Sequence, residues 1–179
     1  MTLWTIGHST KPIDDFLALL TSHGIKCLVD VRTVPRSRHN PQYDTHTLAK
    51  HLKKSGLGYV HLPELGGLRK PKKDSLNTGW KNASFRGYAD YMQTDGFRTA
   101  LEALMEGSRN VPTAIMCAEA VPWRCHRSLI ADALTVRGWT VRHIMTNSKA
   151  DRHRLTPFAV VDDKRVIYPS AGPLEAQPS

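Results

Sequence analysis

Residues 113–134 read TAIMCAEAVPWRCHRSLIADAL, and this stretch decides which fold the sequence favours. The apolar run from Thr113 to Cys117 predicts a buried strand, because strands covered on both faces lose the usual alternation of polar and apolar residues. Apolar residues then recur at helical spacing between Pro122 and Arg137, and Gly138 marks the end of that predicted helix. A buried strand followed by a helix is the repeating unit of an α/β domain with a parallel sheet.

The rest of the chain repeats this unit. Strands are predicted at residues 3–6, 26–31, 59–62, 113–117 and 140–144, and helices at residues 13–23, 45–55, 85–105 and 122–137. The third helix is expected to break near Thr94, and residues 158–168 predict a C-terminal β-hairpin. We therefore expect residues 1–169 to form a single three-layer α/β/α domain, flavodoxin-like or rhodanese-like, with a mainly parallel five-stranded sheet. Residues 170–179 are expected to form a flexible tail.

Composition restricts the class of protein. Hydrophobic residues make up 40% and charged residues 23% of the 179 residues, as in ordinary globular proteins. No apolar run approaches the roughly 20 residues that cross a bilayer, and the N-terminus lacks the pattern of a secretory signal. Three cysteines cannot form a disulfide framework, so we expect free thiols, a cytoplasmic location and no membrane partner. The net charge of +9 favours an anionic small molecule or a nucleic acid as partner, and nothing in the sequence indicates the oligomeric state.

Polar and glycine residues follow the predicted strands, at the points where those strands end. In open α/β sheets, ligands bind outside the carboxyl ends of the strands, and parallel strands bring those ends to one edge. Two groups of candidate residues are placed there. The catalytic candidates are His8, Asp30, Cys117, Glu119, Cys125 and His126. The substrate-binding candidates are Ser9, Arg32, Arg36, Arg38, Glu64, Gly66, Gly67, Arg124 and Arg127.

Single members of this set also have structural interpretations. His8 would cap the first helix, and Asp30 with Arg32 would form a structural ion pair. The glycine pair at residues 66–67 would serve a turn. Their joint placement at one edge favours a functional site, because several polar groups converging on one pocket are typical of ligand binding.

Five short motifs together resemble one known family, and the resemblance runs from Leu3 to about Pro169. The motifs are Gly7-His8-Ser9, Asp30-Val31-Arg32 with Pro35-Arg36-Ser37-Arg38, Glu64-Leu65-Gly66-Gly67, Phe85-Arg86-Gly87-Tyr88, and Cys117-Ala118-Glu119 with Cys125-His126-Arg127. This set is similar to the bacterial and archaeal family called domain of unknown function 488. The resemblance supports the map of candidate residues and implies no particular reaction.

We favour acid–base chemistry on a nucleotide or nucleic acid as the function of this site. Glu119 or Asp30 would act as the base and His8 or His126 as the acid in hydrolysis or transfer. Arginines 32, 36 and 38 would hold a phosphate group.

A second hypothesis is thiol chemistry at Cys117. The thiol would lie at the end of a buried strand and face the N-terminus of the next helix, which lowers thiol pKa values and binds anions. Arg124 and Arg127 would clamp an oxyanion. The layout resembles the cysteine loops of rhodaneses and cysteine phosphatases, but the spacing to Arg124 is one residue longer. Glu119 also stands where a glycine-rich cradle is expected.

A third hypothesis is a transition-metal site formed by Cys117, Glu119, Cys125 and His126, with His8 as an optional further ligand. Adjacent residues on a helix point about 100° apart, so Cys125 and His126 are not expected to share one ion. A metal cofactor is therefore not favoured.

A non-enzymatic hypothesis is a nucleic-acid-binding module. The basic run at residues 69–73 would follow phosphates while Trp80 stacked on a base. The sequence leaves all these hypotheses open.

Overall fold

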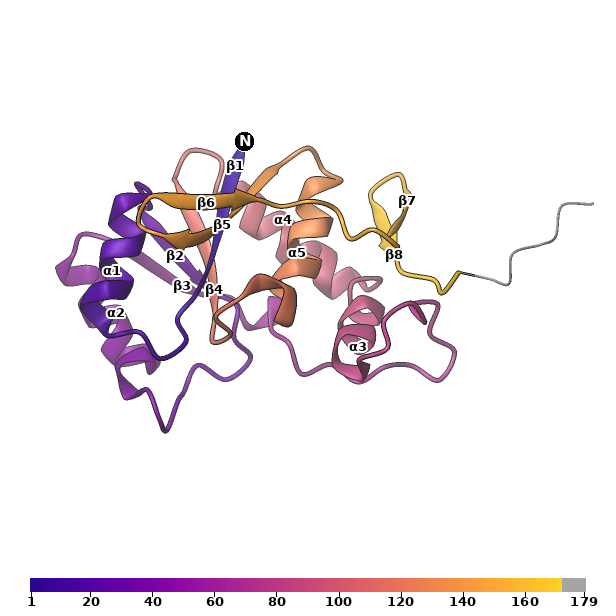
Figure 1. The fold of residues 1–179 in the computed structure, drawn as a ribbon, viewed down its shortest axis with the longest axis horizontal. Helices are drawn as coiled ribbons and strands as arrows, with labels where there is room; N and C mark the ends of the chain where they lie inside the picture. Colours follow the sequence, from indigo (N-terminus) through magenta and orange to yellow (C-terminus); the bar gives the residue numbers. More distant parts are fainter. Residues whose placement is uncertain (172–179) are drawn as a thin grey trace, which may run out of the picture.

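The computed structural model describes residues 1–171, so most of the predicted tail, residues 172–179, lies outside the described part of the chain. Ser170, at the expected start of that tail, still contacts Thr78 through its backbone and its hydroxyl. The elements alternate along the chain as predicted (Figure 1). Strands are β1 Thr2–Gly7, β2 Cys27–Asp30, β3 Gly58–His61, β4 Thr113–Cys117, β5 Thr140–Thr146, β6 Lys149–Arg152, β7 Val160–Asp162 and β8 Arg165–Ile167. Helices are α1 Ile13–Ser22, α2 Thr45–Lys54, α3 Ala83–Tyr91, α4 Asp95–Gly107 and α5 Arg127–Thr135, with 3-10 turns η1 Pro41–Tyr43, η2 Pro63–Leu65 and η3 Pro122–Arg124.

The main sheet has the strand order β3-β2-β4-β1-β5-β6. Strands β1 to β5 run parallel, and β6 pairs antiparallel with β5 at the edge. The predicted α/β class is therefore confirmed, and so is the C-terminal hairpin, which β7 and β8 form as a separate sheet. The predicted number of five strands in the main sheet is one too few within residues 1–171, because β6 was missed. Its sequence KADR is short, polar and largely exposed, so it carries no apolar alternation to reveal it.

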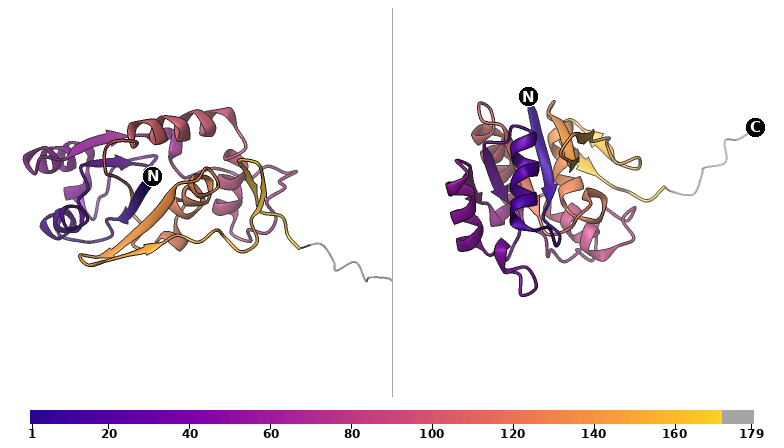
Figure 2. Two further views of the ribbon diagram at one scale, coloured as in Figure 1. Left: turned by 90° about the horizontal axis from the view of Figure 1, so that it is seen from above. Right: turned by 60° about the vertical axis from the view of Figure 1, so that its left-hand side comes forward.

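Two hydrophobic cores lie on opposite faces of the sheet and create the three layers (Figure 2). Helices α1 and α2 cover one face, where Phe16 and Leu48 pack against the strand residue Ile6. Helices α3, α4 and α5 cover the other face, where Leu101 and Ile130 share a core with strand residues such as Ile115 that point away from the first core. Strand side chains alternate between the two cores, as the pleat requires.

Helix α5 begins later than the sequence predicted. Residues Pro122–Arg124 form η3, Cys125 is extended with φ −142° and ψ 150°, and α5 starts at Arg127. Because Cys125 lies outside the helix, the helical angle of about 100° does not separate it from His126. The expectation that these two side chains point apart is wrong, since both contribute to one compact group of ligand atoms.

The long loop between η2 and α3 is held in place by the buried carboxylate of Asp90. This carboxylate accepts hydrogen bonds from the Lys72 backbone (2.8 Å), the Ser75 hydroxyl (2.6 Å) and the Asn77 amide (2.8 Å). The Asn77 side-chain oxygen in turn accepts from the backbone of Tyr168 (2.9 Å). The loop therefore packs against α3 and the C-terminal segment.

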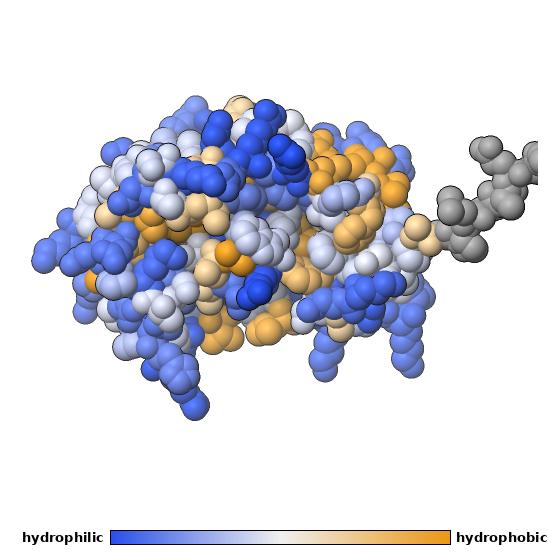
Figure 3. Space-filling model, in the orientation of Figure 1, coloured by the Kyte–Doolittle hydropathy of each residue, from blue (hydrophilic) through white to orange (hydrophobic). Residues whose placement is uncertain are grey.

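The surface is mainly hydrophilic on the face that Figure 3 shows, with an apolar patch near the hairpin β7–β8. Phe158, Val160 and Val161 are exposed there by 39%, 47% and 42%. No helix within residues 1–171 is long and apolar enough to cross a membrane.

Candidate functional site

A cavity of about 310 Å³ lies at the carboxyl ends of the parallel strands. Residues that follow β1 and β2, the turn after β3, the end of β4 and the start of α5 all contribute to its wall. They are His8, Arg32, Thr33, Val34, Arg36, Ser37, Gly67, Leu68, Cys117, Ala118 and His126. Six of the sequence-predicted candidates, namely His8, Arg32, Arg36, Gly67, Cys117 and His126, are thus brought together by the topology of the sheet.

Successive side chains along a strand point to opposite faces of the sheet, and this alternation divides the site into two halves. Asp30 and His8 point toward the face that α1 and α2 cover, where His8 stacks on Tyr43 at 4.1 Å between ring centroids. Cys117 ends β4 on the opposite face and joins the core under α5. The cavity lies where the two halves meet, beyond the strand ends, so one wall carries nitrogen donors and the other carries sulfur.

Arg32 is held rigidly in the first half of the site. Its Nε and Nη2 donate to the two oxygens of Asp30 at 2.9 and 2.6 Å, and Nη2 also donates to the backbone oxygen of Tyr43 at 2.8 Å. The Tyr59 hydroxyl donates to the same Asp30 carboxylate at 2.7 Å. Both carboxylate oxygens of Asp30 are therefore engaged, and this residue orients Arg32.

His8 is neutral and is engaged through both ring nitrogens. Its Nδ1 lies 2.8 Å from the backbone oxygen of Ser9, which can only accept, so Nδ1 carries the hydrogen. Nε2 then accepts from Nη1 of Arg32 at 3.4 Å. Burial lowers the pKa of His8 to about 4, and the charge of Arg32 adds to this effect. His8 thus directs the one guanidinium nitrogen of Arg32 that Asp30 and Tyr43 do not bind.

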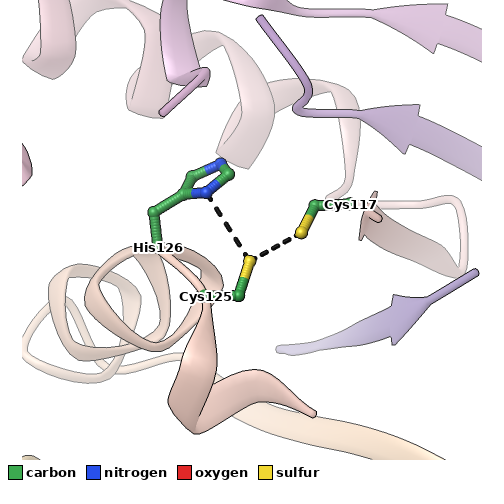
Figure 4. A group of neighbouring side chains, drawn as sticks. All are labelled: Cys117, Cys125 and His126. Atoms are coloured by element: carbon green, nitrogen blue, oxygen red, sulfur yellow. Dashed lines mark hydrogen bonds between the residues drawn. The ribbon is translucent and has the colours of Figure 1, made fainter. Parts of the chain in front are cut away.

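The second half of the site is a pair of buried thiols (Figure 4). The sulfur atoms of Cys117 and Cys125 lie 2.6 Å apart, and each residue is only 4% exposed. Nδ1 of His126 lies 3.5 Å from the Cys125 sulfur. The backbone N–H and the Nε–H of Arg127 donate to the same sulfur at 3.5 and 3.4 Å. The Cys125 sulfur therefore has hydrogen-bond partners in Cys117, His126 and Arg127. Cys117, in contrast, lines the cavity.

The pKa values of the two thiols shift in opposite directions. The hydrogen bond to Cys125 and the burial of the sulfur raise the pKa of Cys117. Burial also acts to raise the pKa of Cys125, but hydrogen bonds from Cys117 and His126, with the charges around them, outweigh burial and lower that pKa well below its ordinary value. Cys125 is accordingly the more acidic member of the pair, and the Cys117 thiol donates to its sulfur.

His126 and Arg127 are both fixed by backbone oxygens. Nε2 of His126 donates to the oxygen of Val31 at 3.0 Å, which leaves Nδ1 to share a proton with the Cys125 sulfur. Arg127 is 1% exposed and donates through Nη2 to the oxygen of Glu119 at 2.6 Å. The loop from β4 to α5 therefore closes around the thiol pair instead of opening toward solvent.

Two glycines allow the backbone to approach the site closely. A Cβ atom on Gly7 would lie 1.8 Å from the oxygen of Glu119, so no side chain fits where β1 passes the β4–α5 loop. A Cβ on Gly67 would lie 3.2 Å from Nδ1 of His126. The hydrogen bond from the Thr33 hydroxyl to the oxygen of Gly67 (2.9 Å) ties the two loops at the cavity together.

Two apolar side chains form part of the cavity wall and are widely exposed. Val34 is exposed by 59% and Leu68 by 83%. Leu68 also has a φ of 59°, in the left-handed region that a leucine rarely adopts. Such strain is typical of functional sites. The sequence interpretation missed both residues, although each is an isolated apolar residue in an otherwise polar loop.

Several predicted candidates lie outside the cavity wall. Glu119, Glu64, Arg38 and Arg124 are exposed. The backbone oxygen of Glu64, not its carboxylate, is engaged, by the hydroxyl of Tyr91 at 2.6 Å. Ser9 and Gly66 shape turns beside the cavity: Ser9 has a φ of 47°, and a Cβ on Gly66 would lie 2.4 Å from the Thr33 hydroxyl.

The aromatic residue proposed to stack on a base is occupied within the fold. The ring of Trp80 stacks on Phe85 at 4.8 Å and meets Phe158 edge-on at 4.9 Å. Arg69, the first residue of the basic run, lies over the ring of Tyr91 at 3.6 Å. Trp80 and Arg69 therefore have partners within the fold.

Three tyrosines support the site, and the sequence interpretation gave none of them a role in it. Tyr43 and Tyr59 hold Arg32 and Asp30, and Tyr88 lies 5.0 Å from the ring of His126 while it donates to the backbone oxygen of Leu65 at 2.7 Å. Tyr88 belongs to the motif at residues 85–88, whereas no local pattern marks Tyr43 or Tyr59.

The fold and the site together define an α/β protein with a thiol pair and two arginines around one cavity at the carboxyl ends of its parallel strands. Residues 12–134 match the family described as domain of unknown function DUF488, and the chain belongs to this family. The match is shorter than the resemblance expected from the motifs and leaves Gly7-His8-Ser9 just outside it. Comparisons with curated proteins and with solved structures give no match.

Proposed function

We propose that this protein is an enzyme that uses Cys117 as a nucleophile on a small anionic substrate bound in the cavity. The observation that carries the proposal is the arrangement of the thiol pair. Cys117 faces the cavity, and a second sulfur lies 2.6 Å behind it, where it accepts from two N–H groups of Arg127 and lies 3.5 Å from Nδ1 of His126. A nucleophilic thiol requires a nearby base that accepts its proton, and Cys125 occupies that position.

The roles of the residues around the thiols follow from their contacts. When Cys117 attacks, its proton crosses the short contact to the Cys125 sulfur, and Nδ1 of His126 shares it. Arg127 stabilises negative charge on the pair through its backbone N–H and its Nε–H. The bond from His126 to the oxygen of Val31 keeps the imidazole oriented.

Anion binding would fall to the two arginines of the cavity wall. Asp30, Tyr43 and His8 engage four of the five N–H groups of Arg32, and the remaining one is on Nη1. Arg36 is exposed at the same wall and contributes a second positive charge. A phosphate or carboxylate group of the substrate would bind between them.

The acid–base hypothesis has less support from the geometry. No carboxylate lines the cavity within residues 1–171, because Asp30 is engaged with Arg32 and Glu119 is exposed elsewhere. The two histidines of the wall use both ring nitrogens in hydrogen bonds. We therefore favour the thiol hypothesis over activation of water.

Charge-selective alkylation tests this function without knowledge of the substrate. Iodoacetate is anionic and iodoacetamide is neutral, so their rate ratio at Cys117 reports the charge of the cavity. We expect a high ratio in the unmodified protein. In Arg36→Ala the ratio should fall on the order of tenfold, since a charge at about 6 Å in an effective dielectric of about 40 contributes about 1.4 kcal/mol.

Arg38→Ala is the matched control, because Arg38 is exposed and lies outside the cavity wall. Cys125→Ala should slow alkylation of Cys117 by both reagents, since it removes the base. Equal ratios in the Arg36 and Arg38 variants, or unchanged rates in the Cys125 variant, would contradict the proposal.

A second function, metal-dependent catalysis, is favoured by one observation. The ligand atoms of Cys117, Cys125 and His126 lie within 4.8 Å of one another, and His126 donates its other ring N–H to a backbone oxygen, as metal-binding histidines do. Two thiolates on one tetrahedral zinc ion stand about 3.8 Å apart, so the sulfurs would have to separate by about 1.2 Å. Native mass spectrometry of the protein titrated with zinc tests this site. One zinc ion per chain, lost in Cys117→Ser, would support it.

A further inference from the structure

The second sulfur restricts the chemistry that the nucleophile performs. Cys125 lies behind Cys117 and does not line the cavity, so it contacts the nucleophile and not the substrate. A thiolate in this position attacks Cys117 only when the Cys117 sulfur carries a leaving group. A bond from Cys117 to a second sulfur atom provides one, whereas a thioester or a thiophosphate directs attack to carbon or phosphorus instead.

We propose that Cys117 and Cys125 form an exchange pair that reduces small anionic disulfides. This inference rests on the proposed role of Cys117 as the nucleophile and names the class of substrate on which it acts. Three features support it: the short sulfur–sulfur contact, the donors gathered at Cys125, and a cavity that reaches only one of the two thiols.

The local backbone permits the two sulfurs to bond. Cys125 has an extended backbone between η3 and α5, so its side chain is not fixed by a helical turn. Cys117 ends β4 and Cys125 follows eight positions later in the β4–α5 connection, so a bond between them requires no rearrangement of distant elements. Arg127 anchors the same loop to the backbone of Glu119.

The reaction balances in two steps. As Cys117 attacks one sulfur of the substrate R–S–S–R′, its proton passes to the Cys125 sulfur, the substrate bond breaks, and R′S⁻ leaves while Cys117 holds RS through a mixed disulfide. Cys125 then gives this proton to R′S⁻, its thiolate attacks the Cys117 sulfur, and RS⁻ leaves. The substrate has gained two electrons, and the protein holds a Cys117–Cys125 disulfide that an external dithiol must reduce before the next turnover.

The cavity wall indicates the form of the substrate. Arg32 and Arg36 bind an anionic group, and the exposed side chains of Val34 and Leu68 offer apolar contacts beside it. The cavity volume of about 310 Å³ accommodates a small molecule, not a protein loop. A compact disulfide that carries a carboxylate and an apolar or aromatic body fits these contacts.

Dithiobis(nitrobenzoate), an aromatic dicarboxylate disulfide, is a suitable probe. Cys27, half-buried in β2, is a third thiol that could also release nitrothiobenzoate. The experiment therefore uses the full chain with Cys27→Ala. We expect two equivalents of nitrothiobenzoate per chain, released at a single rate. The protein should lose the mass of two hydrogens, keep no adduct and regain its thiols with dithiothreitol.

Variants separate this inference from the proposed function. With Cys125→Ser added, one equivalent should be released and a stable adduct should remain on Cys117. With Cys117→Ser added, the reaction should be slower by at least about tenfold, because Cys125 does not reach the cavity. Circular dichroism establishes that each variant is folded.

Two results would overturn the inference in different ways. A stable adduct on Cys117 while Cys125 is present would show a nucleophile without an exchange partner, which refutes the exchange and leaves the proposed function standing. Absence of any reaction at Cys117 would refute the nucleophile itself, and with it both proposals.

Discussion

Acidification should destabilise this protein through two buried histidines, His8 and His143. His143 belongs to a chain of hydrogen bonds within the core. The hydroxyl of Thr5 lies 2.7 Å from its Nδ1, its Nε2 lies 3.0 Å from Nδ1 of His153, and Nε2 of His153 lies 2.7 Å from the carboxylate of Asp132. Because the carboxylate accepts, every donor in this chain is satisfied with both histidines neutral. A proton added to His143 would place a charge on a buried ring and would require the Thr5 hydroxyl to change from donor to acceptor.

The size of the effect follows from the pKa values. Burial, followed by the charges of His153 and Arg127, lowers the pKa of His143 from 6.5 to about 4. Burial likewise lowers the pKa of His8 from 6.5 to about 4. Between about pH 6.5 and about pH 4, the unfolded chain binds protons at these two histidines and the folded chain does not. The free energy of unfolding therefore falls as the pH falls through this range. Between about pH 7 and about pH 4.5, each histidine should remove about 2 kcal/mol from the free energy of unfolding, or about 4–5 kcal/mol together.

Urea denaturation followed by circular dichroism measures this free energy at both pH values. His143→Gln cannot take up the proton, so its free energy of unfolding should fall by only about half as much as that of the unmodified protein. His46→Gln, at an exposed position on α2, is the control and should keep the full pH dependence. A free energy that is equal at the two pH values, or a His143 variant as pH-sensitive as the unmodified chain, would refute the reasoning.

Three further predictions concern the site itself. Asp30→Asn should cost about 3–5 kcal/mol in urea denaturation, because it leaves a buried guanidinium without its partner; a loss below about 1 kcal/mol would contradict the account. Gly7→Ala should cost at least about 1–3 kcal/mol and displace the β4–α5 loop, since its Cβ would meet the oxygen of Glu119 at 1.8 Å; unchanged stability and unchanged thiol reactivity would contradict the contact. Arg127→Lys should raise the pKa of Cys125, measured from thiolate absorbance against pH, because the fixed Nε–H at 3.4 Å is lost; an unchanged titration would show that Arg127 does not stabilise the thiolate.

The sequence predicted the layers of the fold because local patterns encode them. Continuous apolar strands such as residues 113–117, and helices ended by Gly24, Gly56 and Gly138, follow from burial and from left-handed turns, which these three glycines adopt with φ of 68°, 73° and 83°. Strand β6 was missed because an exposed edge strand needs no apolar residues. The late start of α5 was missed because Pro122 fits the first turn of an α-helix as well as that of a 3-10 helix.

The candidate site was predictable only as far as topology determines it. Parallel strands bring residues such as His8, Arg32 and Cys117 to one edge, whatever their side chains do there. The sequence does not show that Tyr59, from the neighbouring strand, completes the partners of Asp30, so the carboxylate looked like an available base. It does not show either that the sulfur of Cys125 turns back to Cys117, because that depends on a single extended residue in the loop.

The identity of the most reactive cysteine tests the central claim most directly. The folded protein would be treated with less than one equivalent of iodoacetate at neutral pH, digested, and the modified peptide identified by mass spectrometry. We predict that the label is on Cys117, because this thiol alone among the three combines a cavity lined by arginines with a base at 2.6 Å. A label on Cys27, or an equal distribution over the three cysteines, would contradict the assignment of Cys117 as the nucleophile.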